Sequence, residues 1–166
     1  MNKTLVVYYS LDGNCKLVAE TLADNLDGEV DVVRIEPVKE ITGGKFKRYF
    51  WGGTQVFMGK EPQIQSINVS VDDYSNIIIG TPVWAWTYSP PIRTFLKENK
   101  IKDKNIAMFC CHGGQVGKTL KNLARVLDGN KVTSQTDFFE PATKDKDENQ
   151  QLIVNWAKEL QQLINL

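Results

Sequence analysis

The chain carries no net charge, because its 20 Lys and Arg residues are matched by 20 Asp and Glu. This balance removes the main electrostatic reason to expect a nucleic acid or an anionic membrane surface as a partner. No apolar run approaches the roughly 18 residues of a membrane span, and no basic-then-apolar leader opens the sequence. We therefore expect a cytoplasmic protein with neither a nucleic-acid nor a membrane partner.

Cysteine and histidine are also scarce. The 166 residues include three cysteines (Cys15, Cys110 and Cys111) and one histidine, His112. Three cysteines make no disulfide framework, and they lack the C-x-x-C spacing that would hold a metal. The composition therefore predicts free thiols and no metal site.

Strand-like and helix-like patterns alternate along most of the chain. Five short apolar runs are typical of strands buried on both faces of a parallel sheet: 4–9, 30–35, 77–79, 106–111 and 131–139. Stretches with apolar residues at helical spacing lie between most of these runs and after the last. We expect one α/β domain over residues 1–166, a three-layer α/β/α sandwich around a five-stranded parallel sheet.

The first strand runs into a turn that opens a helical pattern. Its sequence is Ser10-Leu11-Asp12-Gly13-Asn14-Cys15. A helix that starts after such a turn presents free backbone N–H groups and the positive end of its dipole to an anion. The Asp12 carboxylate would repel a triphosphate, whereas hydroxyl and N–H donors can hold a single phosphomonoester. The turn therefore predicts a site for the phosphate of a mononucleotide.

Two further segments should lie near this turn, because ligands of such sheets bind outside the carboxyl ends of the strands. They are Thr81-Pro82-Val83-Trp84-Ala85-Trp86 and Cys111-His112-Gly113-Gly114. Indoles in a loop after a strand are costly to leave in water, so Trp84 and Trp86 indicate contact with a flat ligand. The alternative is that they only cover the apolar end of the sheet. Gly113 and Gly114 allow the backbone to approach the edge of a ring.

The turn after the first strand resembles that of the flavodoxin family, the FMN-binding electron carriers, and the resemblance covers essentially the whole chain. The family's first loop has the form Ser/Thr-x-Thr-Gly-Asn-Thr, which Ser10, Gly13 and Asn14 match. Asp12 and Cys15 replace two hydroxyls that bind phosphate in the family. The resemblance implies FMN as cofactor, a strand order of 2-1-3-4-5, and binding at the switch point between the first and third strands.

The resemblance also implies that the loops after the third and fourth strands hold the flavin ring between them. Trp84 or Trp86 would then lie on one side, and His112, Gly113 and Gly114 on the other. We treat His112 as a contact candidate rather than a catalytic residue, and we assign no catalytic residue. The implied function is electron transfer between redox partners, by a monomer or a weak dimer.

Two departures from the family favour an alternative, a two-electron reductase. The chain is neutral, whereas electron-carrier flavodoxins are usually acidic. Val83 and Ala85 stand where a glycine would ease a change to positive φ, and a Cβ opposes that change by roughly 1 kcal/mol. An FMN-dependent NAD(P)H:quinone-type reductase would pass electrons to a small-molecule acceptor instead of a partner protein.

Two other features need separate interpretation. Residues 112–119 end in Gly-Lys-Thr, as in a P-loop for nucleotides, but His112 replaces the first glycine. The third strand ends at Gly80, where such an enzyme needs a metal-binding aspartate.

The aromatic segment Gly43–Pro62 fits a covering helix followed by a loop. A wall beside the flavin and a subunit contact remain alternatives for it.

Overall fold

The computed structural model describes residues 3–39 and 61–164. Within these ranges a six-stranded sheet is formed by β1 (Thr4–Tyr8), β2 (Val30–Arg34), β3 (Asn76–Trp84), β4 (Thr87–Tyr88), β5 (Asn105–His112) and β6 (Lys131–Phe139). The helices are α1 (Asn14–Asn25), α3 (Pro90–Glu98), α4 (Thr119–Val126) and α5 (Lys146–Ile164), with a 3-10 turn η1 (Val71–Asp73). No helix in the described part of the chain combines the length and apolar character needed to cross a membrane.

The long strands lie in the order β2-β1-β3-β5-β6 and are all parallel. With these five strands numbered along the chain, this is the 2-1-3-4-5 order that the sequence resemblance implied, and the prediction is confirmed. Tyr8 at the end of β1 faces Arg34 of β2 on one side and Gly80 of β3 on the other. The ends of these strands therefore form one edge of the sheet, from which the loops of the site emerge.

The structure adds a strand that the sequence did not predict. β3 continues beyond Gly80 to Trp84, and the two residues of β4 return antiparallel to its last residues. Thr81-Pro82 suggested a strand end, but Pro82 stays in parallel register with Cys111 of β5. A proline at the margin of a sheet is tolerated where its missing N–H is not needed. The expectation that Thr81–Trp84 is a loop was therefore wrong.

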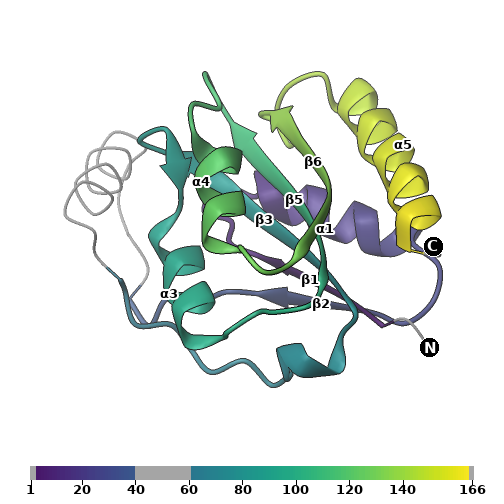
Figure 1. Ribbon diagram of the computed structural model, residues 1–166. Coiled ribbons are helices and arrows are strands. Elements are labelled where there is room, and N and C mark those ends of the chain that lie inside the picture. The colour runs from purple at the N-terminus through teal and green to yellow at the C-terminus, as the bar shows by residue number, and fades with distance from the viewer. Residues whose placement is uncertain (1–2, 40–60, 165–166) are drawn as a thin grey trace.

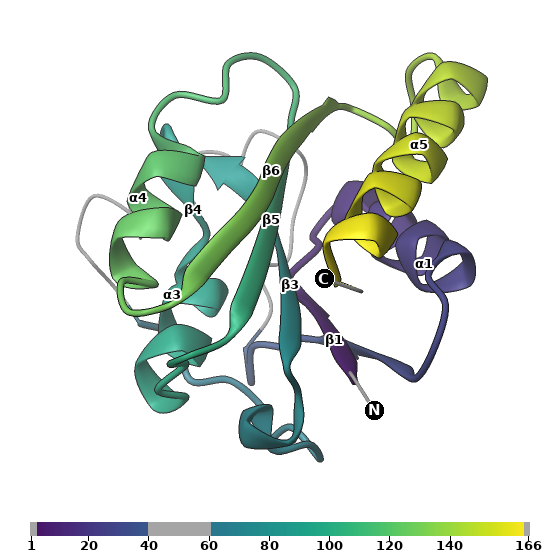
Figure 2. The same cartoon turned by 45° about the vertical axis from the view of Figure 1, so that its right-hand side comes forward.

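Helices cover both faces of the sheet, with α1 and α5 on one side and α3 and α4 on the other (Figures 1 and 2). Each strand contributes side chains to the hydrophobic cores on both faces of the sheet, because successive side chains point to opposite faces. In β1, Val6 joins the core beneath α1 and α5, while Leu5 and Val7 join the core beneath α3 and α4. This double burial explains the continuous apolar runs from which the strands were predicted.

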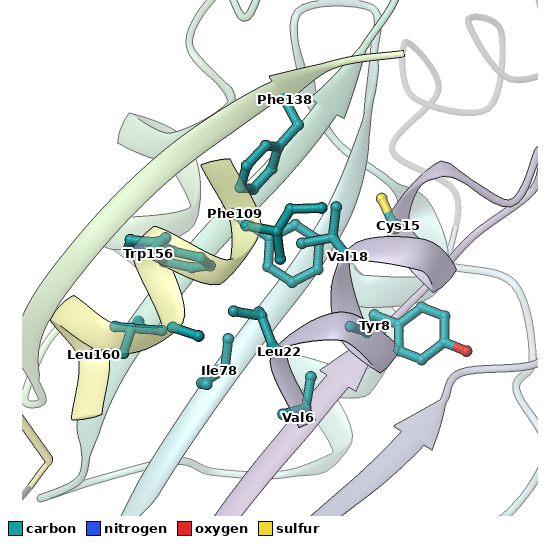
Figure 3. Close-up of a cluster of buried hydrophobic side chains, with 14 of the residues drawn as sticks. Val6, Tyr8, Cys15, Val18, Leu22, Ile78, Phe109, Phe138, Trp156 and Leu160 are labelled. Atoms are coloured by element: carbon teal, nitrogen blue, oxygen red, sulfur yellow. The ribbon is translucent and has the colours of Figure 1, made fainter. Parts of the chain in front are cut away.

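An aromatic cluster fills the core beneath α5 (Figure 3). The ring of Phe109 meets Phe138 edge to face at 6.3 Å and Trp156 at 6.1 Å between centroids. Gly80 lies directly against Phe109, since a Cβ built on this glycine would lie 2.1 Å from the ring. Packing against Phe109 therefore requires glycine at position 80, where the sequence analysis had ended the third strand. An aspartate would not fit there.

The aromatic segment Gly43–Pro62 lies outside the described residues, apart from Glu61 and Pro62. Its three interpretations stay predictions.

Candidate cofactor site

The turn between β1 and α1 has the backbone geometry of an anion site. Gly13 precedes the helix with φ +85°, a left-handed conformation that strongly favours glycine. A Cβ on Gly13 would meet no atom of the described residues within 4 Å, so the turn is open on this side. Gly13 also provides no side-chain cap for α1. The first N–H groups of the helix therefore face this open turn.

Ser10 is the residue of this turn that most clearly fits a bound ligand. It is only 3% exposed, and its Oγ has no hydrogen-bond partner among the described residues. Leaving a buried hydroxyl without a partner costs about 1–3 kcal/mol. A phosphate oxygen would accept its hydrogen bond, so the side chain fits the phosphate of a mononucleotide.

Arg34 is a residue of this region that the sequence analysis missed. Its guanidinium Nη2 donates to the carbonyl oxygen of Ser10 at 3.2 Å, from the end of the neighbouring strand β2. The arginine thus holds the Ser10 carbonyl and brings positive charge to the turn, which also contains the exposed Asp12. The sequence signal that could have identified Arg34 is its place as a basic residue at the end of the second strand, which was expected to lie beside the first strand.

Asn14 and Cys15 use their side chains within the protein. The Asn14 Oδ1 accepts a hydrogen bond from the backbone N–H of Ala142 at 3.0 Å, which ties α1 to the turn before α5. Cys15 is 1% exposed and lies in the core beside Val18 (Figure 3). Leu11 packs against the core beneath α3 and α4. Cys15 and Leu11 thus present mainly backbone to the open side of the turn.

The second predicted segment forms a hairpin whose two tryptophans have different surroundings. Trp84, the last residue of β3, packs edge to face on Tyr9 with ring centroids 5.7 Å apart. Trp86 lies in the turn between β3 and β4 and is 65% exposed. Trp84 therefore supports the fold, and Trp86 is the indole that can meet a ligand.

The turn of this hairpin has a strained backbone. Ala85 has φ +46° and Trp86 has φ +61°, as a two-residue hairpin of type I′ requires. Such angles cost a residue with a Cβ about 1–2 kcal/mol each. The Cβ of Ala85, which we expected to oppose a change to positive φ, therefore does not prevent that conformation.

Contacts from the β5–α4 loop brace the strained turn. The backbone N–H of Lys118 donates to the carbonyl oxygen of Trp86 at 3.0 Å, and Gly117 packs against Trp86. At the base of the hairpin, the buried Thr81 Oγ1 accepts from the Ser89 N–H at 3.0 Å, and Pro82 and Val83 are half-buried. The Thr81 hydroxyl thus closes the hairpin.

The third predicted segment places a polar side chain and two glycines at the end of β5. His112 Nδ1 lies 2.9 Å from the carbonyl oxygen of Gly114, and Nε2 lies 2.9 Å from Asp137 Oδ2 on β6. Gly113 and Gly114 are exposed. Their backbone is therefore accessible at the same edge as the β1–α1 turn.

The thiols at this end of β5 are buried. Burial is the main cause that raises the pKa of Cys110 and Cys111 well above the usual range, and a hydrogen bond with Cys15 adds to it for Cys111. Cys111 joins Cys15 in the core beneath α1 and α5. The raised pKa values make the thiols of Cys110 and Cys111 neutral buried groups rather than nucleophiles.

The Gly-Lys-Thr sequence also has a structural role. Thr119 is fully buried and donates its hydroxyl to the carbonyl oxygen of Val116 at 2.7 Å. Together with Gly117 and Lys118 it closes the loop against the β3–β4 hairpin. This arrangement occupies the hydroxyl that a P-loop would use for a metal ion.

A comparison of sequences identifies the family. The sequence model of the family described as flavodoxin matches residues 3–156. The chain belongs to the flavodoxin family. No curated protein matches it.

Solved structures similar to this flavodoxin-family chain include a flavoprotein from Lactobacillus acidophilus NCFM in complex with FMN. That protein shares 26% identity and a TM-score of 0.73, over 88% of this chain and 98% of its own. A flavodoxin from the domain Archaea (16% identity, TM-score 0.66) and an azoreductase from Bacillus anthracis str. Sterne (14%, 0.56) each match over 99% of both chains. At these low identities, the archaeal flavodoxin and the azoreductase show only that the fold is similar.

FMN is the cofactor that the family and the Lactobacillus complex support. The side chains and turns of this flavodoxin-family chain fit it. The Ser10 hydroxyl, which lacks a partner within the described part of the chain, and the open Gly13 turn suit its phosphate, while the exposed Trp86 and the Gly113–Gly114 backbone suit its ring.

Proposed function

We propose that this chain is an FMN-dependent electron carrier that passes electrons between redox partners. The observation that carries the proposal is the buried Ser10 hydroxyl, which has no hydrogen-bond partner among the described residues and lies at the head of the open β1–α1 turn. A protein retains such a group at a cost unless a ligand satisfies it. A phosphate bound at this turn, in a chain of the flavodoxin family, would be that of FMN.

Each part of the site has a separate task in this proposal. Ser10 Oγ and the first N–H groups of α1 bind the phosphate, and Arg34 adds positive charge behind the turn. Trp86 and the backbone of Gly113 and Gly114 would hold the flavin ring. When bound, FMN supplies one- and two-electron redox chemistry, and the protein supplies its orientation and surroundings.

A two-electron reductase is the second candidate, favoured by the charge balance of the chain. Its 20 acidic and 20 basic residues provide little overall field to steer a basic partner protein. A small uncharged acceptor, such as a quinone, needs no such steering. In this version a nicotinamide cofactor would be the electron donor.

Absorption spectroscopy of the purified protein tests the proposal first. We expect a yellow protein whose extracted flavin is FMN, and an apoprotein that binds FMN more tightly than riboflavin. Equal affinity for the two flavins would contradict the assignment of the phosphate turn. Anaerobic mixing with NADH or NADPH then separates the two candidates, because a carrier alone is reduced slowly and a reductase rapidly.

A further inference from the structure

The loop between β6 and α5, residues 140–145, contacts two segments of the candidate cofactor site. It joins the edge strand β6 to α5, which packs beside α1 (Figure 2). At the start of the loop, the Glu140 N–H donates to the carbonyl oxygen of His112, the last residue of β5, at 2.9 Å. Two residues later, the Ala142 N–H donates to Oδ1 of Asn14, the first residue of α1, at 3.0 Å. One loop therefore connects the phosphate turn to the segment expected beside the flavin ring.

A tight turn fixes the part of the loop that holds these two anchors. The Glu140 carbonyl oxygen accepts from the backbone N–H groups of Thr143 and Lys144, both at 2.9 Å. Pro141, between the anchors, is buried, and its ring restricts φ. The turn therefore sets the spacing between the Glu140 and Ala142 N–H groups, so that a shift of the loop moves both anchors.

Both ends of the loop have a left-handed backbone. Glu140 and Asp145 each have φ +38°, which a residue with a Cβ rarely adopts. Such angles persist only where the surrounding structure holds the chain in them. The strain therefore indicates that contacts from neighbouring elements maintain the shape of the loop.

Asn149 supplies such contacts from the first turn of α5 and is 7% exposed. Its Nδ2 lies 3.0 Å from the carbonyl oxygen of Lys144, 3.4 Å from that of Asp145 and 3.5 Å from that of Phe139. All three neighbours are acceptors, so the nitrogen of the amide rather than its oxygen must face them. Because Phe139 ends β6 and Asp145 ends the loop, one buried amide holds the two ends of the loop together.

We propose that Asn149 is a positioning residue of the cofactor site. By fixing the loop 140–145, it keeps the phosphate turn at Asn14 and the backbone at His112 in one frame, so that the two ends of FMN meet a preformed site. This inference rests on the proposed function. It predicts that loss of the Asn149 amide weakens the binding of the phosphate and the binding of the ring together.

Asn130 offers a matched control, because it has a similar structural role at the opposite edge of the sheet. It precedes β6, and its Nδ2 donates to the carbonyl oxygens of Ile101 at 2.9 Å and Leu127 at 2.8 Å. Its Oδ1 accepts from the Lys104 N–H at 3.1 Å. Asn130→Ala thus removes a comparable set of bonds to the backbone at the amino ends of β5 and β6, away from the site.

The first test uses the apoprotein, without any flavin. Amide hydrogen exchange followed by NMR measures the protection of the Glu140 and Ala142 N–H groups. We expect both to exchange about five-fold faster in Asn149→Ala than in Asn130→Ala, the effect of one lost hydrogen bond. Urea unfolding checks that both variants fold and compares their stability. Asn149→Ser, whose hydroxyl keeps one donor, is the milder variant and should show the same change to a smaller extent.

The second test measures the dissociation constants of FMN and riboflavin by flavin fluorescence. The riboflavin constant reports on the ring, and the ratio of the two constants reports on the phosphate. We expect Asn149→Ala to weaken riboflavin binding by about three-fold and FMN binding by about ten-fold, within the range of one or two lost hydrogen bonds. Asn130→Ala should bind both flavins as the parent does.

Three results would overturn the role of Asn149. They are unchanged exchange at Glu140 and Ala142, flavin constants in Asn149→Ala that match those of the parent or of Asn130→Ala, and a loss confined to the ring or to the phosphate. A parent protein that binds no FMN would instead overturn the proposed function. Faster exchange at Ala142 in Asn149→Ala would then still establish that Asn149 holds the loop.

Discussion

Gly117 and Trp86 pack backbone to backbone, so that a Cβ built on Gly117 would lie 2.5 Å from the Cβ of Trp86 and 2.9 Å from its Cα. The two residues come from different loops, one after β5 and the other between β3 and β4. The contact means that the loop after β5 determines where the exposed indole of Trp86 stands. The two segments proposed to hold the flavin ring therefore form one unit.

Replacing Gly117 with alanine should disturb this unit. The added methyl group strains a backbone at φ +61° and collides with Trp86, so the hairpin turn must shift. We expect FMN affinity to fall by about ten-fold, together with a stability loss of at least the 1–2 kcal/mol typical of a left-handed residue. Gly129→Ala is the control, because its φ of +89° carries similar strain and its added Cβ would meet no atom of the described chain within 4 Å. Similar affinity losses in both variants would show that the contact with Trp86 is irrelevant.

The two hairpin tryptophans should respond differently to truncation. Trp84→Ala removes the contact with Tyr9 and should lower the free energy of unfolding by about 2–4 kcal/mol. Trp86→Ala removes an exposed side chain, so stability should change by less than about 0.5 kcal/mol. Loss of a stacking partner should still weaken FMN binding by about 1 kcal/mol or more. Urea unfolding and flavin fluorescence measure the two effects, and unchanged quenching in Trp86→Ala would contradict the stacking role.

Ser10→Ala should separate folding from phosphate binding. The buried hydroxyl has no partner in the described structure, so its removal should leave the apoprotein as stable as before, or more stable by up to about 1 kcal/mol. FMN affinity should fall by about five- to ten-fold, because one hydrogen bond to the phosphate is lost. Riboflavin, which has no phosphate, is the control ligand. An equal loss of affinity for both flavins would point to a distorted turn instead.

Asp31 should make stability depend on pH in acid. Its Oδ2 accepts a hydrogen bond from Tyr74 Oη at 2.7 Å and pairs with Lys3 at 3.0 Å. The bond from Tyr74, and then that from Lys3, hold the pKa of Asp31 below its usual range. A carboxyl with a lowered pKa in the folded state stabilises the fold above its unfolded value, and this contribution is lost as the pH falls.

The measurement is a series of urea titrations between about pH 6 and about pH 3, which brackets the unfolded aspartate value. The free energy of unfolding of the parent should fall more steeply toward acid than that of Asp31→Asn. Asp24→Asn, which changes an exposed carboxylate on α1, should follow the parent. Parallel curves for the parent and Asp31→Asn would show that the hydrogen bond from Tyr74 to Asp31 does not contribute to the pH dependence of the free energy of unfolding.

Electron transfer to protein partners should depend weakly on salt. A carrier with a strong net charge loses long-range attraction when ions screen it over about 10 Å at 0.1 M. This chain has 20 charges of each sign, and negative charge is concentrated only in local groups such as Asp72 and Asp73. Stopped-flow rates across ionic strength measure the effect. A steep decrease in rate with salt would indicate a clustered acidic face despite the neutral total.

The loops at the carboxyl edge were predictable because each follows an apolar strand. The turn from Ser10 to Cys15 was located correctly for this reason, and so was the end of β5 at His112. The hairpin was not, because the pairing of β4 with β3 depends on contacts between segments that no local pattern encodes. The same holds for Arg34, whose link to Ser10 requires β2 and β1 to be neighbours.

The sequence by itself determined the parallel sheet, the family and the turn that suits a phosphate. Burial on both faces imposes long apolar runs, and a left-handed backbone before a helix selects glycine at position 13. Tertiary structure alone decided which tryptophan is exposed, where the Cys15 and Cys111 thiols point, and which acceptors meet His112. Packing decides these features, because the partners of a side chain at a sheet edge come from strands far apart in the sequence.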